Sequence, residues 1–264
     1  MSRSAFGNVH IPLSRGGRLL LGGSIILSVL AGLLTAFQTN AVIIFVVSAG
    51  ALALLAALVG QATEQVGERL GSGATGVLQS ALGNLPELFV GIFALRAGLI
   101  EVVQSALVGS ILGNSLFVLG LAFLVGGLRH GTQKFSSQAP RMIANLTLLA
   151  VAALIIPTLT SGLHTPAAGH EDGLSIACAI ILLIVFIASI PVSLHGGPEK
   201  LPEEEYTLVN PWPIWFAIVI LVGAGVGSAF VSDWFVSALT PAISLLHSPM
   251  PFLALLLWHW LEMR

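Results

Sequence analysis

The sequence predicts an all-α fold, a polytopic bundle of about seven to eight membrane-spanning helices. Only 8% of the 264 residues are charged and 56% are hydrophobic, and the mean hydropathy is +0.97. A soluble domain carries about 25% charged residues, so this composition excludes a soluble core. Apolar runs near the spanning length of about 20 residues recur along the chain, which indicates helices that cross a bilayer.

The apolar runs set the expected positions of the spans. We expect them at residues 19–37, 41–63, 74–95, 100–126, 140–159, 173–194 and 213–231. A last apolar run at 249–261 is short for a bilayer, so whether it crosses the membrane stays open. A polar, acidic segment at 196–210 separates the sixth and seventh runs, and we read it as a solvated linker.

Basic residues fall almost entirely on one side of these spans. With a cytoplasmic N-terminus and alternating spans, only Arg96 faces outward, and the residues that face inward are Arg3, Arg15, Arg18, Arg69, Arg129, Lys134, Arg141 and Lys200. Positive charge concentrates on the cytoplasmic side of membrane proteins. We therefore expect an integral, multi-pass protein with its N-terminus in the cytoplasm. The membrane that we expect is a bacterial inner (plasma) membrane.

The chain lacks the sequence motifs that are typical of several function classes. The sequence contains no basic patch, no phosphate-binding glycine loop, no C-x-x-C and no G-x-S-x-G. We therefore expect no nucleic-acid partner, no enzymatic activity and no cofactor.

The segment around Glu87 holds the polar residues that an apolar span tolerates least. A carboxylate at membrane depth is costly and marks a functional site by default. At helical spacing, Ser80, Asn84 and Glu87 share one face, which presents a hydroxyl, an amide and a carboxylate. Hard cations such as Ca²⁺ prefer oxygen ligands, so Glu87 and Asn84 are candidate metal ligands. The alternative is a proline kink beside a protonated, hydrogen-bonded carboxyl group.

Two neighbouring residues shape the backbone at this point. Pro86 has no N–H and clashes with the carbonyl of Leu82, so it frees main-chain oxygen inside the span. Gly83 lets a second backbone come close. A free carbonyl at membrane depth must face protein, water or an ion, so the kink adds main-chain oxygens beside Glu87. Interrupted helices of this kind occur at the midplane sites of secondary transporters.

A related pattern follows in the next span. S-A-L-G-N at residues 80–84 recurs as S-I-L-G-N at 110–114, so Ser110 and Asn114 are again four residues apart. Gly109 and Gly113 form a G-x-x-x-G, which permits close helix contact. We expect the two spans to cross here, so that Ser110 and Asn114 complete a polar cage around Glu87. A purely packing role for the glycines is equally compatible.

Three further acidic residues lie near span ends. Glu64 ends the second span on the cytoplasmic side, and Glu101 begins the fourth span on the outer side. Each is a candidate for the access path of a cation, and each is equally compatible with an ordinary interfacial carboxylate. We expect Asp233, in S-D-W-F, to begin a helix.

The sequence G-N-L-P-E-L-F-V-G-I-F-A-L-R-A-G-L-I-E-V-V-Q-S-A-L-V-G-S-I-L-G-N-S-L-F-V-L-G, at residues 83–120, resembles the Ca²⁺/H⁺ antiporters of the cation/Ca²⁺ exchanger superfamily. It carries the first of the two α-repeats of that family, within about 74–126. A-T-E-Q before it and the acidic linker are also similar, so the resemblance covers roughly residues 15–247. By position in the motif, Glu87 matches the repeat glutamate, with Gly83, Asn84 and Pro86 beside it and Ser110 and Asn114 as partners.

The resemblance implies an inverted-repeat cation exchanger fold and exchange of Ca²⁺ for protons by alternating access. It divides the chain into an N-terminal segment (1–18), an extra span (19–37), a first five-helix half (41–195), the cytoplasmic linker (196–210) and the start of a second half (211–264). Burial disfavours a charged carboxyl group, so a proton and Ca²⁺ are expected to exclude each other at Glu87.

The chain departs from this family in its last residues. No second G-N-x-x-E follows Asp233, and residues 249–264 read P-M-P-F-L-A-L-L-L-W-H-W-L-E-M-R. We expect an early stop or a frame change there. The alternatives to an active antiporter are therefore a non-transporting half-transporter or membrane subunit, and a Na⁺-coupled exchanger. A homo-oligomer or a complementing second half stays open as the partner.

Overall fold

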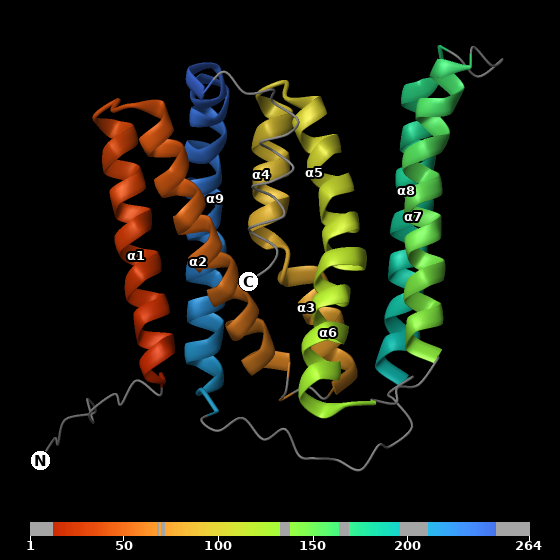
Figure 1. The fold of residues 1–264 in the computed structure, drawn as a ribbon, viewed down its shortest axis with the longest axis horizontal. Coiled ribbons are helices and arrows are strands. Elements are labelled where there is room, and N and C mark those ends of the chain that lie inside the picture. The colour runs from red at the N-terminus through yellow and green to blue at the C-terminus, as the bar shows by residue number, and fades with distance from the viewer. Residues whose placement is uncertain are drawn as a thin grey trace, which may run out of the picture.

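The structure is a computed structural model that describes residues 13–67, 69, 72–132, 138–163, 169–195 and 211–246. Every regular element in these ranges is helical (Figure 1), as the predicted all-α class requires. The helices are α1 (Arg15–Ala36), α2 (Ala41–Gly67), α3 (Ser72–Leu82), α4 (Leu85–Arg96), α5 (Ile100–Leu112), the π-helical η1 (Gly113–Val118), α6 (Leu119–His130), α7 (Gln138–Gly162), α8 (Glu171–His195) and α9 (Ile214–Leu246). The linker at 196–210 and the apolar run at 249–261 lie outside the described residues.

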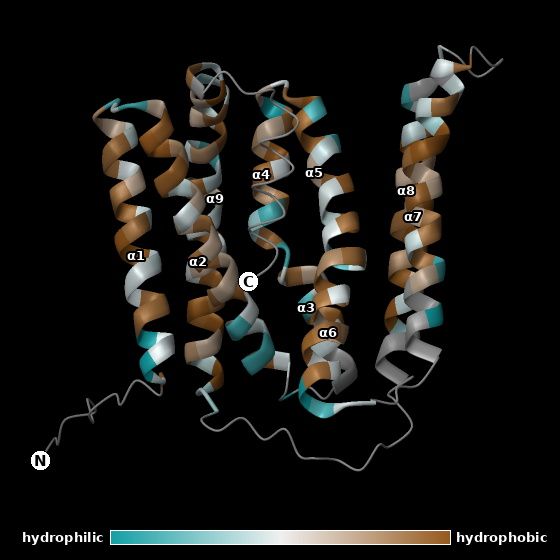
Figure 2. Cartoon of the chain, in the orientation of Figure 1, coloured by the Kyte–Doolittle hydropathy of each residue, from teal (hydrophilic) through white to brown (hydrophobic). Residues whose placement is uncertain are grey.

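The helices have the length and polarity that a bilayer demands. Within the described ranges, the segments long and apolar enough to cross a membrane are Arg15–Ala36, Ala41–Gly67, Ile100–His130, Asp172–Pro191 and Ile214–Leu245. A shorter apolar segment, Ala144–Thr160, lies in α7. Figure 2 shows hydrophobic residues along the middle of the helices and hydrophilic residues near many of their ends. The chain is an integral, multi-pass membrane protein.

Helices α2 and α9 form the core of the described bundle. They pack along each other, with α1 and α4 beside them. Phe45 of α2 stacks on Phe235 of α9 with ring centroids 4.9 Å apart. Helix α1 comes close to α9 because Gly32 has no side chain: a Cβ atom there would lie 2.8 Å from the ring of Trp234. Close packing of this kind holds α2, one wall of the candidate site, in a defined position.

A second set of contacts anchors the start of α9 to the end of α2. The backbone N–H of the buried Trp212 donates to Oε1 of Gln65 at 2.7 Å. Nη2 of Arg69 donates to the carbonyl oxygen of Trp212 at 2.6 Å. The Trp212 ring also meets Phe216 edge to face, 5.4 Å between centroids. Segments about 145 residues apart in sequence are therefore joined at one end of the bundle.

The basic residues that the structure describes lie as the charge pattern predicts, whereas Arg3, Lys134 and Lys200 lie outside the described residues. Helix α1 begins, α2 ends, α6 ends and α7 begins at the same end of the bundle (Figure 1). These helix ends carry or adjoin Arg15, Arg18, Arg69, Arg129 and Arg141. Arg96 ends α4 at the opposite end.

Two span predictions are wrong in detail. The third span, expected as one kinked helix over 74–95, is two helices, α3 and α4, separated by Gly83 and Asn84. The seventh, expected to stop at residue 231, continues as α9 to Leu246. Asp233 therefore lies inside a helix and does not begin one. Its carboxylate is exposed on the surface of α9 and therefore does not disturb the packing of the helix. The apolar and small residues on both sides of Asp233 continue the helical pattern without interruption.

Candidate functional site

The candidate site is built on the break between α3 and α4. Gly83 closes α3 by donating its N–H to the carbonyl of Gln79 at 2.9 Å. Asn84 precedes α4, and its carbonyl accepts the N–H of Leu88 at 3.0 Å. Pro86 and Glu87 are the second and third residues of α4. A proline fits this first turn, where no preceding carbonyl needs its missing N–H, which explains why the chain breaks here and does not merely bend.

The break places opposite helix ends around Glu87. The N-terminus of α4 carries partial positive charge, and this favours the carboxylate of Glu87 in its first turn. The last carbonyls of α3 have no partner within the helix and carry partial negative charge. An interrupted helix thus offers one end that stabilises the carboxylate and another that attracts a cation. A single kinked helix, as the sequence predicts, would free a carbonyl near Pro86 but would place no helix N-terminus at Glu87.

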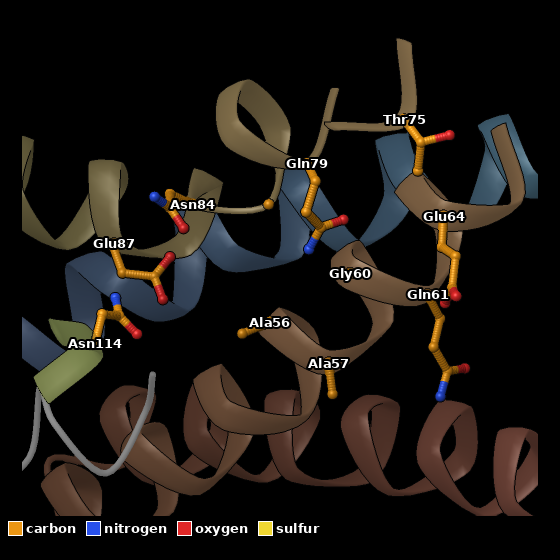
Figure 3. Close-up of a pocket in the computed structure, with 11 residues that line it drawn as sticks. Ala56, Ala57, Gly60, Gln61, Glu64, Thr75, Gln79, Asn84, Glu87 and Asn114 are labelled. Carbon is orange, nitrogen blue, oxygen red and sulfur yellow. The ribbon is translucent and has the colours of Figure 1, made fainter. Parts of the chain in front are cut away.

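A polar cavity of about 580 Å³ lies on one side of Glu87. It is lined by Ala56, Ala57, Gly60, Gln61, Glu64, Thr75, Gln79, Gly83, Asn84, Glu87 and Asn114. Figure 3 shows Glu87, Asn84 and Asn114 grouped at one end, and Glu64, Gln61 and Thr75 at the other. The cavity runs between α2, α3 and the start of α4, and Asn114 reaches it from η1. We call it the polar cavity below.

A second hollow, which we call the apolar groove, lies on the other side of Glu87. Its volume is about 340 Å³, and it is lined by Asn84, Glu87, Leu88, Gly91, Ile92, Leu95, Val103, Leu107 and Ser110. Asn84 and Glu87 belong to both hollows. The half-buried Glu87 therefore stands at the boundary between a polar and an apolar environment.

The structure brings most of the predicted site residues together. Gly83, Asn84, Glu87 and Asn114 share the polar cavity with Glu64, as candidates for a site and its access path. Pro86 is buried in the first turn of α4. Ser80 belongs to α3, but its side chain lies outside the described residues. Because α3 and α4 are separate helices, regular helical spacing is interrupted between Ser80 and Glu87, and the expected face shared by Ser80, Asn84 and Glu87 stays a prediction.

The expected polar cage around Glu87 stays a prediction, and the structure places its two proposed partners in different hollows. Asn114 lines the polar cavity, whereas Ser110 lines the apolar groove, so the two residues reach Glu87 from different sides. The physical reason is the helix between them. The chain leaves the α conformation at Gly113 and follows a π-helical path through Asn114, which changes the angle between successive side chains. The prediction from regular i, i+4 spacing assumed an α-helix and therefore did not include this π-helical segment.

Glu101 occupies a different region. It is exposed in the first turn of α5, at the opposite end of the bundle from Glu64 (Figure 1). It is absent from the described residues that line the polar cavity and the apolar groove.

Sequence reasoning missed three polar residues of the cavity, Gln61, Thr75 and Gln79. Their spacing held a signal. Thr75 and Gln79 are four residues apart on α3, and Gln61 and Glu64 are three apart on α2, so each pair lies on one helix face. Polar residues at helical spacing inside apolar runs predict a wet surface between helices.

The cavity offers oxygen ligands and lacks a preformed metal cluster. Among the described residues, no three His, Cys, Asp or Glu side chains gather into a group that could hold a metal ion. The lining instead supplies one carboxylate at each end, with amide and hydroxyl oxygens between them. Ca²⁺ takes six to eight oxygens, so these side chains with waters provide part of a shell.

Comparison with known proteins relates this arrangement to transporters. The family model for the sodium/calcium exchanger protein matches residues 40–194, more than half of the chain and all of the residues that line the polar cavity. A Ca²⁺/H⁺ antiporter of Aphanothece halophytica is 34% identical over 221 residues, which cover 75% of this chain and 58% of the relative. The Ca²⁺/H⁺ antiporter ChaA of Bacillus subtilis strain 168 is 31% identical over 222 residues, which cover 81% and 62%.

The fold has a solved counterpart. The structure of native YfkE is similar with a TM-score of 0.74 and 25% sequence identity, over 92% of this chain and 69% of that one. The chain spans about three fifths of the length of the two curated relatives.

Proposed function

Because the chain belongs to the sodium/calcium exchanger family, within the cation/Ca²⁺ exchanger superfamily, we propose that it forms the first half of a Ca²⁺/H⁺ antiport site centred on Glu87. One observation carries the proposal: Glu87, Asn84 and Asn114 meet at a helix break, at the inner end of a polar cavity. The relatives named above are Ca²⁺/H⁺ antiporters, which supports the choice of ions.

The chemistry follows from competition at one carboxylate. In the Ca²⁺ state, Glu87 and the amide oxygen of Asn84 bind the ion, and Asn114 supplies a further amide. In the proton state, the carboxyl group is neutral and no longer attracts a divalent cation. Each form excludes the other, so release of a proton on one side of the membrane favours uptake of Ca²⁺ there, and the reverse holds on the other side.

Glu64 serves as the outermost ligand of the access path. It lies at the far end of the polar cavity, on the α2 terminus that adjoins Arg69. With the N-terminus in the cytoplasm, this end of the bundle is the cytoplasmic end. The cavity then opens to the cytoplasm of a bacterial inner membrane, and the protein exports Ca²⁺ in exchange for protons.

The site requires further ligands for full affinity. Glu87 supplies one negative charge at the inner end of the cavity, which does not neutralise a divalent ion. We propose that an inverted second half, resident in this or another chain, supplies a second carboxylate and the remaining oxygens. An antiparallel homodimer is disfavoured, because the charge bias gives every copy the same orientation.

The test is radiolabelled Ca²⁺ uptake into everted membrane vesicles that carry this chain, driven by an imposed pH gradient. When a complementing second half is present in the same membrane, we expect uptake by the wild type, loss of uptake in Glu87→Gln, and wild-type uptake in Asp172→Asn, which removes an exposed carboxylate from α8. Uptake that survives Glu87→Gln would contradict the proposal.

The same assay separates the competing functions. Uptake driven by a Na⁺ gradient, with no response to pH, would identify a Na⁺-coupled exchanger. A chain that is present in the membrane but carries no ion would identify a non-transporting half or subunit.

A further inference from the structure

Gln79 lies midway along the polar cavity, at a point that the function above leaves unassigned. Figure 3 shows its side chain between Glu64 and the group formed by Glu87 and Asn84. It extends from α3, one helical turn after Thr75 and one turn before Gly83. The side chain is exposed to the cavity that it lines. A cation that moves between the two carboxylates therefore passes this amide.

Two glycines leave room for the Gln79 side chain. A Cβ atom at Gly83 would lie 3.0 Å from Nε2 of Gln79 and 3.3 Å from Cδ, closer than ordinary contact. A Cβ atom at Gly60 would lie 3.8 Å from the same Nε2, in ordinary van der Waals contact. The amide thus sits against the backbone of α2 on one side and the helix break on the other. Its position is confined by main chain, which gives it a defined place in the cavity.

An amide has the right chemistry for a ligand between two carboxylates. Its oxygen is a hard, neutral ligand of the kind that Ca²⁺ accepts, and its NH₂ group donates to water or to a carboxylate. A third negative charge would hold the ion more strongly and slow its departure. An apolar side chain would remove the amide oxygen that lies midway between the ends of the cavity. A neutral oxygen allows both binding and onward movement.

We propose that Gln79 contacts the cation directly and passes it between Glu64 and Glu87. This inference rests on the proposed function, because it assumes that a cation occupies the cavity. The amide oxygen replaces one water of the partly dehydrated ion before Glu87 and Asn84 replace others. Gly83 is required because a Cβ atom there would lie 3.0 Å from Nε2 of Gln79 and narrow the space in which the amide turns from one partner to the other.

The experiment compares Ca²⁺ binding to the purified full-length chain and to four variants, with radiolabelled Ca²⁺ as the probe. Gln79→Leu removes the oxygen at similar size, and Gln79→Glu adds a charge. Gln104→Leu makes the matched change at an exposed position of α5 outside both hollows. Glu87→Gln reports on the proposed function itself.

We expect Gln79→Leu to raise the Kd for Ca²⁺ about tenfold, the size of one lost contact to a charged group. Gln79→Glu is expected to lower the Kd and to slow Ca²⁺ dissociation, and Gln104→Leu to match the wild type. Opposite shifts in the two Gln79 variants separate a ligand from a structural residue, because a folding defect weakens binding in both.

The remaining outcomes overturn one inference or both. Wild-type affinity in Gln79→Leu, with binding lost in Glu87→Gln, overturns the role of Gln79 and leaves the proposed function standing. Equal weakening in Gln79→Leu and Gln79→Glu also overturns that role. Unchanged binding in Glu87→Gln overturns the proposed site, and a wild-type chain that binds no Ca²⁺ overturns both.

Discussion

The two hollows that meet at Glu87 differ in what they offer to an ion. The polar cavity presents the side chains of Gln61, Glu64, Thr75, Gln79 and Asn114. The apolar groove is lined mainly by Leu88, Ile92, Leu95, Val103 and Leu107. A hydrated cation is stable among the first set and costly among the second, because apolar walls replace none of its water. The difference in lining favours the approach of an ion to Glu87 through the polar cavity over an approach through the apolar groove.

The same comparison explains why Glu87 lies at a boundary. A carboxylate surrounded only by apolar side chains would remain neutral, and one in open water would bind a cation weakly. A carboxyl group between the two environments changes between its neutral and its charged form according to which side is hydrated. An exchanger that works by alternating access requires such a group.

The largest expected effect comes from a glycine on the polar side. Gly83→Ala places a methyl group against the backbone oxygen and side chain of Gln79, so we expect the helix break to distort. Overpacking of this kind costs about 1–3 kcal/mol of stability, and we expect Ca²⁺ binding to fall with it. Thermal unfolding in detergent and radiolabelled Ca²⁺ binding measure both. Gly91→Ala is the matched change in the apolar groove, where a new Cβ atom meets nothing within 4 Å, and should leave both values unchanged. Equal losses of stability and Ca²⁺ binding in the two variants would contradict the proposed difference between the polar cavity and the apolar groove.

Cysteine accessibility tests the difference in hydration directly. With Cys178 replaced by Ser, single cysteines are introduced as Ala57→Cys in the polar cavity and Leu107→Cys in the apolar groove. A charged thiol reagent should modify the first at least about tenfold faster, because the reactive thiolate forms in water. Ca²⁺ should slow the modification of the first alone. Similar rates at both positions would show that the groove is hydrated as well.

Glu64→Gln should have a smaller effect than changes at Glu87. The exposed carboxylate at the cavity mouth attracts the ion without enclosing it, so we expect the Kd for Ca²⁺ to rise about fivefold at low salt. The difference should shrink at high ionic strength, because salt screens an exposed charge. Binding measured at two salt concentrations checks this. Glu101→Gln, at the other end of the bundle, is the control. An equal rise in its Kd for Ca²⁺ would show that Glu64 has no particular role in attracting the ion to the cavity.

The smallest expected effect on ion binding comes from the contact between α2 and the start of α9. Gln65→Leu removes the acceptor of the buried Trp212 N–H, which costs about 1–3 kcal/mol of stability. Because Gln65 does not line the polar cavity, Ca²⁺ affinity should stay near the wild-type value while the unfolding temperature falls. A large loss of affinity would indicate that this end of α2 also shapes the cavity.

The sequence predicted the membrane bundle well, and the reason is physical. A segment in lipid must satisfy its own backbone groups, so a long apolar run has few conformations other than a helix. The starts of α1, α2 and α5 were therefore predicted within a few residues. The end of α9 was not, because Asp233 was read as a boundary, although one exposed carboxylate does not stop a long apolar helix that packs against α2.

The composition of the site was predicted in part. Glu87, Asn84 and Gly83 were named because Asn, Pro and Glu together are conspicuous inside an apolar run. Gln79 and Gln61 were missed because amides in a membrane helix are compatible with packing, with lipid headgroups or with a water-filled surface. Their spacing identified a helix face, and only the position of α2 shows what that face meets.

By itself, the sequence determined that the chain spans a membrane, which end carries the basic residues, and that its backbone is disturbed near Pro86. These properties depend on local composition and on the cost of placing polar groups in lipid. The tertiary structure decided that the disturbance is a complete break, that Asn114 and Ser110 lie on different sides of Glu87, and that Glu64 and Gln79 share a cavity with it. Those relations depend on how closely helices approach, as α1 and α9 do at Gly32, and that approach is a property of packed pairs which no single segment contains.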